Sequence, residues 1–93
     1  MRKRIYKIIE SGKKVRGIFF DVYYKERDEY KTGFIVSSKI GRATKRNYVK
    51  RIIREIWREN FKNGDFVFIL KLSAIDKNKQ EIINEAKRMV KFL

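Results

Sequence analysis

The chain contains no cysteine, no histidine and no proline among its 93 residues. The absence of Cys excludes disulfides, thiolate nucleophiles and Cys-based zinc or iron–sulfur sites. The absence of His removes the only side chain that titrates near neutral pH without perturbation, so a general base would have to be a strongly shifted carboxylate or lysine. Catalysis by the polypeptide itself is therefore disfavoured.

Long apolar runs are also missing. The longest spans residues 66–70, far short of the roughly 20 residues that a membrane-spanning helix requires. The basic start of the chain resembles a signal peptide, but Lys7 and Glu10 interrupt the apolar segment that would have to follow. We therefore expect a cytoplasmic protein with no membrane partner.

Positive charge is abundant and unevenly distributed. The chain has 25 Lys and Arg against 11 Asp and Glu, a net charge of +14. Residues 1–16 hold seven basic side chains and one acidic, and residues 39–58 hold eight basic side chains and only Glu55 as an acid. Such clustering indicates a surface that binds a polyanion rather than a device for general solubility.

Hydrophobic periodicity predicts a small α+β domain that spans residues 1–93, with no repeat, linker or domain boundary. Helices are expected at 3–11, 45–61 and 78–92, and strands at 15–24, 30–37 and 65–72. The order α-β-β-α-β-α leaves room for one extra short strand. The first two strands are expected to form an antiparallel hairpin, and the apolar run at 66–70 a largely buried strand. Strands 30–37 and 65–72 would be joined by a parallel crossover if they share a sheet.

Finer features of these elements can also be predicted. Gly12 is expected to end the first helix, Thr44 to cap the second, and the segment 63–64 to stop it. Asn78 and Glu81 resemble a capping box for the third helix. Trp57 lies in the apolar stripe of helix 45–61 and is expected in the core.

Helix 45–61 separates charge from apolar surface. Val49, Ile52 and Ile56 form one stripe. Within a wedge of roughly 100° opposite that stripe lie Asn47, Lys50, Arg51, Arg54 and Arg58. A solvated helix face usually mixes Glu with Lys, whereas this face consists of four cations and an amide. Such a row can pair with successive phosphates of a nucleic acid.

Two stretches in the middle of the chain resemble the protein component of bacterial ribonuclease P. They are residues 33–43, GFIVSSKIGRA, and residues 46–55, RNYVKRIIRE. In that family a strand ending in Ser-Lys-Lys-x-Gly-x-Ala leads into a helix beginning Arg-Asn-Arg-x-x-Lys-Arg-x-x-Arg-Glu. Ser38 and Tyr48 stand where the family has Lys and Arg. Tyr48 can stack or donate one hydrogen bond, but it cannot grip a phosphate with two.

The resemblance implies that the chain is the protein subunit of a tRNA-processing ribozyme. In this family an RNA subunit with bound Mg²⁺ removes the 5′ leader of precursor tRNA, and the protein helps to bind substrate, leader and metal. No catalytic residue is therefore expected in the polypeptide, and the Mg²⁺ is expected to be bound mainly by the RNA subunit. The implied partners are ribonuclease P RNA and precursor tRNA, with no obligatory protein partner. The family's crossover between its parallel strands is left-handed, against the general preference for right-handed connections.

The expected contacts with RNA fall into two groups. The resemblance assigns RNA-subunit contacts to Arg46, Asn47, Lys50, Arg51 and Arg54, and the charge pattern adds Lys39, Arg42, Lys45 and Arg58. The family's leader-binding cleft lies between the sheet and the first helix, which here implies Phe19, Tyr23, Arg4 and Lys7. Aromatic rings on a sheet can stack unpaired bases of any sequence, although aromatics in strands are more often core.

Other interpretations are open at this point. The acidic residues Glu26, Asp28 and Glu29 alternate with basic ones without the ligand spacing of a metal site, so a solvated turn is expected. A small ribosome-dependent mRNA-cleaving toxin would also be basic and of this length, and a ribosomal or other structural RNA-binding protein would share the charge. A helix-turn-helix would need a helix just before 45–61, where a strand is predicted. Binding to a membrane surface would need the apolar stripe of helix 45–61, which the core requires.

Overall fold

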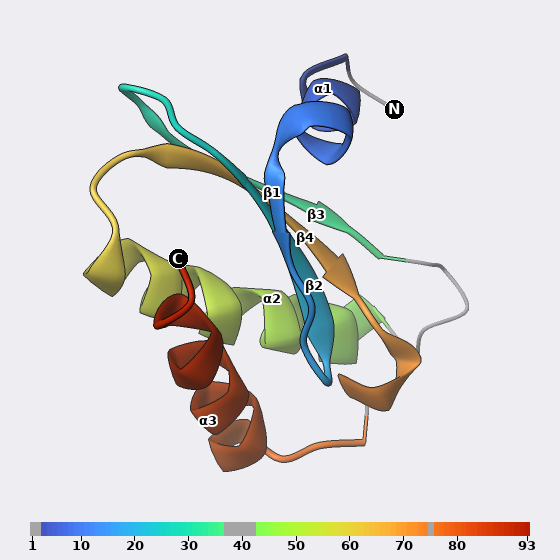
Figure 1. The fold of residues 1–93 in the computed structure, drawn as a ribbon. Helices are drawn as coiled ribbons and strands as arrows, with labels where there is room; N and C mark the ends of the chain where they lie inside the picture. The colour runs from blue at the N-terminus through green and yellow to red at the C-terminus, as the bar shows by residue number, and fades with distance from the viewer. Residues whose placement is uncertain (1–2, 37–42, 75) are drawn as a thin grey trace.

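The protein folds into three helices and a four-stranded sheet (Figure 1). The computed structural model describes residues 3–36, 43–74 and 76–93. The elements in chain order are α1 Lys3–Ser11, β1 Lys13–Val15, β2 Phe20–Lys25, β3 Tyr30–Ile35, α2 Ala43–Asn60, β4 Gly64–Leu70, the short 3₁₀ helix η1 Leu72–Ala74, and α3 Lys79–Val90. The α+β class and the element order are as predicted, and β1 is the extra short strand.

The strand that comes last in the sequence lies inside the sheet. The strand order is β1-β2-β4-β3, with β4 antiparallel to β2 and parallel to β3. The predicted hairpin between β2 and β3 is therefore wrong, because β4 separates the two strands. β4 is apolar and buried on both faces along most of its length, which suits a central position, whereas β2 and β3 each carry half-exposed side chains.

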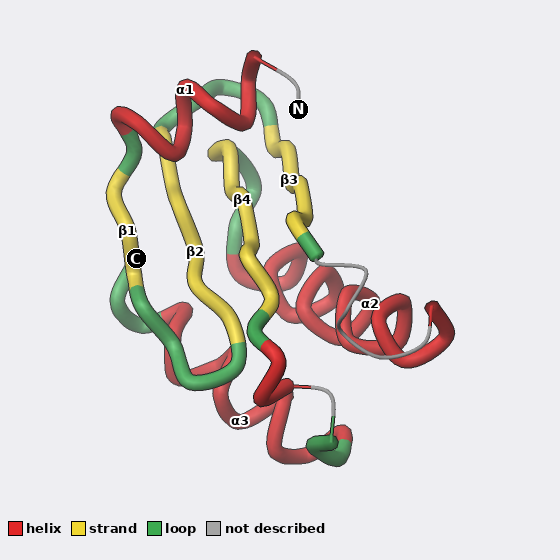
Figure 2. The backbone as a smooth tube through the Cα atoms, turned by 90° about the vertical axis from the view of Figure 1, so that its right-hand side faces the viewer, coloured by secondary structure: helices red, strands yellow, loops and turns green. Residues whose placement is uncertain are grey.

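The crossover from β3 through α2 to β4 is left-handed, as the family resemblance implies. In Figure 2 both strands run downward, β4 lies to the left of β3, and α2 lies behind the sheet. When this view is turned within its plane so that both strands point upward, the chain passes from β3 on the left to β4 on the right through α2 at the back. This is the opposite of the usual hand.

The strand predicted at 15–24 is interrupted, because Val15 ends β1 and β2 begins only at Phe20. The chain turns at 16–19, so that β1 pairs antiparallel with β2. Gly17 permits this turn to lie against α3, since a Cβ at this position would be 2.4 Å from the sulfur of Met89. Ile18, at the outer side of the turn, is 63% exposed. The extended backbone of β2 therefore begins only at Phe20.

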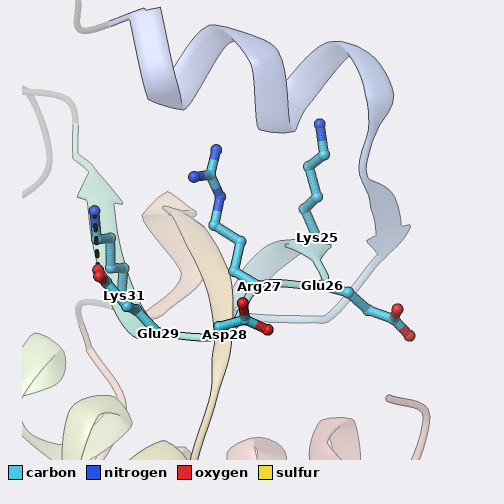
Figure 3. Close-up of a pocket in the computed structure, with 6 residues that line it drawn as sticks. All are labelled: Lys25, Glu26, Arg27, Asp28, Glu29 and Lys31. Atoms are coloured by element: carbon cyan, nitrogen blue, oxygen red, sulfur yellow. Dashed lines mark ion pairs between the residues drawn. The ribbon is translucent and has the colours of Figure 1, made fainter.

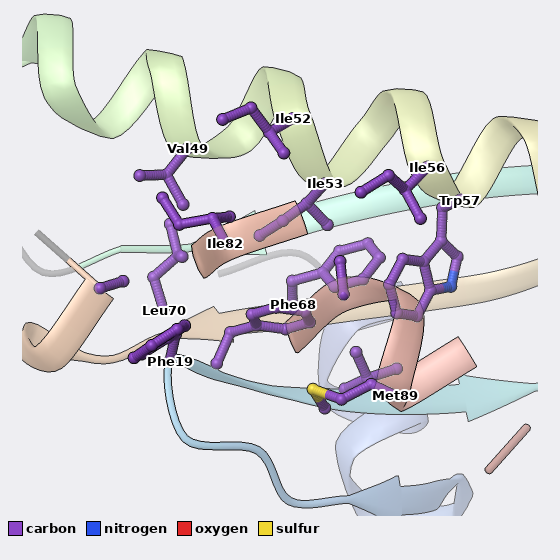
Figure 4. Packing of buried hydrophobic residues seen from close by; sticks show 14 of the residues in the cluster. Phe19, Val49, Ile52, Ile53, Ile56, Trp57, Phe68, Leu70, Ile82 and Met89 are labelled. Atoms are coloured by element: carbon purple, nitrogen blue, oxygen red, sulfur yellow. The ribbon is translucent and has the colours of Figure 1, made fainter. Parts of the chain in front are cut away.

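The main core lies between the sheet and the pair α2 and α3 (Figure 4). Trp57 is fully buried, as predicted, and its ring stands edge-on to Phe68 with the centroids 4.9 Å apart. Ile82 and Met89 of α3 are fully buried in the same cluster. The Asn78 side chain accepts a hydrogen bond from the Glu81 N–H at 2.9 Å, so the predicted cap of α3 is confirmed.

The first helix, α1, lies on the side of the sheet away from α2 and α3 (Figures 1 and 2). Ile8 of α1 and Val67 of β4 are both fully buried, yet neither belongs to the main core. Gly12 ends α1 and its N–H donates to the Ile8 carbonyl at 2.8 Å. A Cβ on Gly12 would lie 2.7 Å from the Tyr24 carbonyl oxygen, so the close approach of α1 to β2 requires glycine here.

The ends of α2 differ from the prediction. Thr44 lies inside the helix rather than at its cap, and the helix ends at Asn60, before the predicted stop at 63–64. Gly64 instead begins β4, with a φ of 115° that favours glycine.

Candidate nucleic-acid interface

The outer face of α2 is rich in basic side chains. Val49, Ile52 and Ile56 are buried against the sheet and α3, as predicted. Among the predicted contacts, Lys50 and Arg46 are half-buried, and the remaining described ones are exposed: Lys45, Asn47, Arg51, Arg54 and Arg58. Lys39 and Arg42 lie outside the described residues. We call Arg46, Lys50, Arg51, Arg54 and Arg58 the α2 cations.

Three of the α2 cations lie over aromatic rings. The Arg54 guanidinium carbon lies 5.0 Å and the Lys50 Nζ 5.9 Å from the centroid of the Phe34 ring. The Arg51 guanidinium lies 5.8 Å from the centroid of the Tyr48 ring. The ion pairs found among the described residues lie elsewhere, on Asp21, Glu29, Asp65 and Glu85. The charges of α2 therefore remain available to an anionic partner.

Neither ring was predicted from the sequence to be part of this surface. Tyr48 departs from the family motif, yet it lies beneath Arg51. Phe34 falls on the core face of β3 by alternation, which is a signal for packing and not for binding. Only the position of β3 at the edge of the sheet, beside α2, brings the Phe34 ring under two cations.

The positive charge of Arg58 also acts on Tyr30. Burial raises the pKa of the Tyr30 phenol, and the nearby positive charge of Arg58 partly opposes that rise. The Tyr30 hydroxyl is buried and has no hydrogen-bond partner among the described residues. Tyr30 therefore stays neutral at physiological pH.

The face of the sheet opposite α2 carries the second predicted site. Tyr23 is half-buried there, and its cross-strand partners are Lys14 on β1 and Val67 on β4. The Lys14 Nζ lies 5.2 Å from the centroid of the Tyr23 ring. Lys7 of α1 is exposed, and the side chain of Arg4 lies outside the described set. Tyr23 and Lys14 thus form a small aromatic and cationic patch.

Phe19 does not belong to this patch. It precedes β2, is only 9% exposed, and packs in the main core on the side of α2 and α3 (Figure 4). The structure therefore does not bring Phe19 together with Tyr23, the two aromatic residues predicted to bind the leader. Phe19 still lies in the turn at 16–19, and its carbonyl accepts the Lys71 N–H at 2.9 Å.

A carboxylate organises the cations beside Tyr23. Asp21 lies two residues before Tyr23, on the same face, and its side chain is 14% exposed. It forms ion pairs with the Nζ atoms of Lys71 at 3.0 Å and Lys14 at 3.9 Å, and it accepts the Gly17 N–H at 3.2 Å. Lys71 also donates to the Gly17 carbonyl at 2.6 Å. Lys14 and Lys71 could not be assigned to this patch from the sequence, because Lys14 lies on β1, Lys71 follows the end of β4, and the two meet only through Asp21.

The loop between β2 and β3 is a solvated turn (Figure 3). In that view Lys25 and Arg27 point toward α1, whereas Glu26 and Asp28 point away from it. Lys31 pairs with Glu29 at 3.5 Å. In residues 3–36, 43–74 and 76–93 there is no group of three or more acidic side chains that could hold a metal ion.

Asp65 is a fully buried carboxylate beneath this loop. The Arg27 Nε lies 3.3 Å from its Oδ2. Its cross-strand partners in the sheet are Lys25 on β2 and Lys31 on β3. This arrangement ties the loop and the start of β4 together.

Another buried carboxylate, Glu85 of α3, anchors the turn at 16–19. It accepts hydrogen bonds from the Ile18 N–H and, at 2.7 Å, from the Arg88 Nε. Burial alone would raise the pKa of Glu85, but the hydrogen bonds from Arg88, Ile18 and Phe19 and the charge of Arg88 outweigh it and hold the pKa below its ordinary value. Glu85 is therefore ionised and structural at neutral pH.

No helix among the described residues is long and apolar enough to cross a bilayer.

Comparison with known proteins identifies the family. The family model of ribonuclease P matches residues 1–93. A ribonuclease P protein component of Clostridioides difficile is 35% identical over 92 residues, which cover 91% of this chain and 81% of the relative. One of Staphylococcus epidermidis is 37% identical over 91 residues, covering 91% and 79%.

Solved structures agree with the sequence matches. The RNase P protein of Staphylococcus aureus superimposes with a TM-score of 0.84 at 26% identity, covering 99% of this chain and 91% of that one. The RNase P protein of Thermotoga maritima gives a TM-score of 0.81 at 27% identity, covering 100% and 96%. A match along the whole chain, together with the shared fold, shows that this protein belongs to the ribonuclease P protein family and is a protein subunit of the endoribonuclease that processes tRNA.

Proposed function

We propose that this chain is one RNA-binding domain whose α2 binds the RNA subunit of ribonuclease P and whose open sheet face binds the 5′ leader of precursor tRNA. The observation that carries the first half is the α2 surface, where five cations gather while the described ion pairs lie elsewhere. The toxin and the other RNA-binding alternatives are not favoured, since the family match spans the chain.

Binding of the RNA subunit is a matter of phosphate neutralisation and shape. Arg side chains can fork across phosphate oxygens, and Lys50 adds a point charge. Each phosphate that is neutralised releases counterions, so affinity should fall steeply with salt. Lys45 and Asn47, at the start of α2, belong to the proposed surface, and the proposal also includes Lys39 and Arg42, which precede α2 in the sequence.

Binding of the leader uses the patch around Tyr23. A base of any identity can stack on the ring, while Lys14 and Lys71, held by Asp21, lie within reach of the backbone phosphates. Lys7 of α1, which is exposed, would contact phosphates of the same leader RNA, and the proposal also keeps Arg4, whose side chain lies outside the described set. Phe19 is left out because it is part of the core.

The chemistry belongs to the RNA subunit in this proposal. Mg²⁺ supplies the activated water and stabilises the leaving oxygen in metal-assisted phosphodiester hydrolysis. The described acidic side chains of this chain do not form a group that fits a metal. We propose that the RNA subunit holds the Mg²⁺. The polypeptide positions substrate in the cytoplasm, alongside its RNA partner and without an obligatory protein partner.

A reconstitution assay tests the proposal. The full chain is mixed with a bacterial ribonuclease P RNA and a precursor tRNA at low Mg²⁺, and cleavage at the mature 5′ end is timed. We expect faster cleavage with protein than without, and a loss of that gain in the double variant Arg51→Gln/Arg54→Gln. Lys87→Gln, on the exposed side of α3, removes a charge away from α2 and serves as the matched control. Equal rates with and without protein would contradict the proposal.

A further inference from the structure

We infer that Phe34 is a positioning residue of the α2 surface: its ring holds Lys50 and Arg54 in the arrangement in which they meet the RNA subunit. The inference rests on the proposed role of α2. It adds an apolar residue of the sheet to a binding surface that is otherwise built from charges on a helix.

The Phe34 ring is itself held by the core. Phe34 is half-buried on the edge strand β3 and stacks on Phe68, with the centroids 4.8 Å apart and the planes at 22°. Phe68 is fully buried and is braced edge-on by Trp57 and Phe20. The ring is thus a rigid platform with one face against the core.

The two cations lie over the face that remains. Lys50 and Arg54 are one helical turn apart on α2, and both of their charged groups lie within 6 Å of the Phe34 centroid. A cation at this distance over an aromatic face is attracted by the ring quadrupole. Neither side chain is paired with a carboxylate among the described ion pairs. The ring therefore orders both side chains without neutralising them.

Order without neutralisation is useful for binding a polyanion. Long flexible side chains lose conformational entropy when they bind, and a platform that restricts them beforehand reduces that loss. A carboxylate could restrict them too, but it would cancel the charge that the phosphates need. Leucine at 34 would fill the same space in the core and provide no aromatic face.

The central experiment measures binding of the full chain to a bacterial ribonuclease P RNA across a range of salt concentrations. Phe34→Leu should weaken binding by about 5- to 20-fold, as expected when two long side chains lose their order. The slope of log affinity against log salt should stay unchanged, because the same phosphates are contacted. Phe34→Tyr keeps the ring and should restore the affinity. Thermal unfolding of each variant shows that the comparison is made between folded proteins.

Two backgrounds separate positioning from general loosening of the fold. In Lys50→Gln/Arg54→Gln, the side chains that the ring holds are gone, so Phe34→Leu should have no further effect on affinity. The Arg58→Gln background lacks a cation that lies near Tyr30 and not near Phe34. Phe34→Leu should therefore keep its full effect on affinity in this background. A merely structural role for Phe34 would give the same effect in both backgrounds.

The outcomes distinguish the inference from the proposed function. If Lys50→Gln/Arg54→Gln weakens RNA binding but Phe34→Leu does not, the inference on Phe34 is wrong and the proposed α2 interface stands. An equal effect of Phe34→Leu in both backgrounds also overturns the inference. If Lys50→Gln/Arg54→Gln leaves RNA binding unchanged, the interface itself is misplaced and the inference fails with it.

Discussion

Replacing Glu85 by Gln should destabilise the fold in a pH-dependent way. Glu85 is 5% exposed and connects α3 to the turn at 16–19 through the Ile18 N–H and to Arg88. Gln keeps one acceptor but loses the charge, so the charge-assisted part of these hydrogen bonds disappears. We expect a cost of about 1–2 kcal/mol.

For a chain of this length that cost is a visible shift in melting temperature. A domain of 60–100 residues loses about 4–8 °C per kcal/mol, so Glu85→Gln should melt about 4–16 °C lower than the unchanged protein at neutral pH. Glu55→Gln, at an exposed position on α2, makes the same chemical change where no hydrogen bond is lost. It should melt within about 2 °C of the unchanged protein.

The pH dependence follows from the depressed pKa of Glu85. Because the folded-state pKa lies below the ordinary value, the carboxylate stabilises the fold fully above the unfolded-state pKa. This contribution is lost as the pH falls through the folded-state pKa. The gap in melting temperature between the unchanged protein and Glu85→Gln should therefore narrow from pH 7 to about pH 2.5. A gap that stays constant over this range, or no gap at neutral pH, would refute the assigned role of the ionised Glu85.

Three further predictions concern the two surfaces and one turn. Arg54→Gln should lower the slope of log affinity for the RNA subunit against log salt by about one phosphate, and an unchanged slope would mean that Arg54 is only solvated. Tyr23→Leu should weaken binding of precursor tRNA by about 5- to 100-fold, as expected for loss of one stacked base, while leaving leaderless tRNA unaffected; equal losses for both RNAs would speak against a leader contact. Gly64→Ala should cost about 1–3 kcal/mol because of the φ of 115° and a Cβ contact of 2.9 Å with the Phe66 and Tyr24 rings, and a melting temperature equal to that of the unchanged protein would exclude strain at this turn.

The sequence predicted helices better than strand pairing. The apolar stripe of α2 and the cap of α3 are local patterns, and the structure confirms both. The partner of a strand is a non-local choice: nothing in residues 20–35 shows that β4 will separate β2 from β3. The left-handed crossover came only from the family resemblance, because general chain geometry favours the other hand.

In the candidate site, too, local patterns were predicted from the sequence and tertiary contacts were not. Helical periodicity placed Lys50, Arg51, Arg54 and Arg58 opposite the apolar stripe of α2, and in the structure that stripe is buried while Arg51, Arg54 and Arg58 are exposed and Lys50 is half-buried. Phe19 was misplaced because the turn at 16–19 cannot be told from a strand by alternation alone. Phe34, Lys14 and Lys71 were missed because each acquires its neighbours through tertiary structure: the β3 edge next to α2 for Phe34, and Asp21 for the two lysines.

The central position of β4 has a consequence for how the molecule folds. β2 and β3 have no direct pairing with each other, and both must wait for a strand that begins at Gly64. Most of the sheet is thus made of contacts distant in sequence, which slows folding relative to a helical protein of equal size. Until β4 is synthesised, β2 and β3 present open edges on which other chains could pair. We expect the strong positive charge, through mutual repulsion of nascent chains, to protect the protein during this interval.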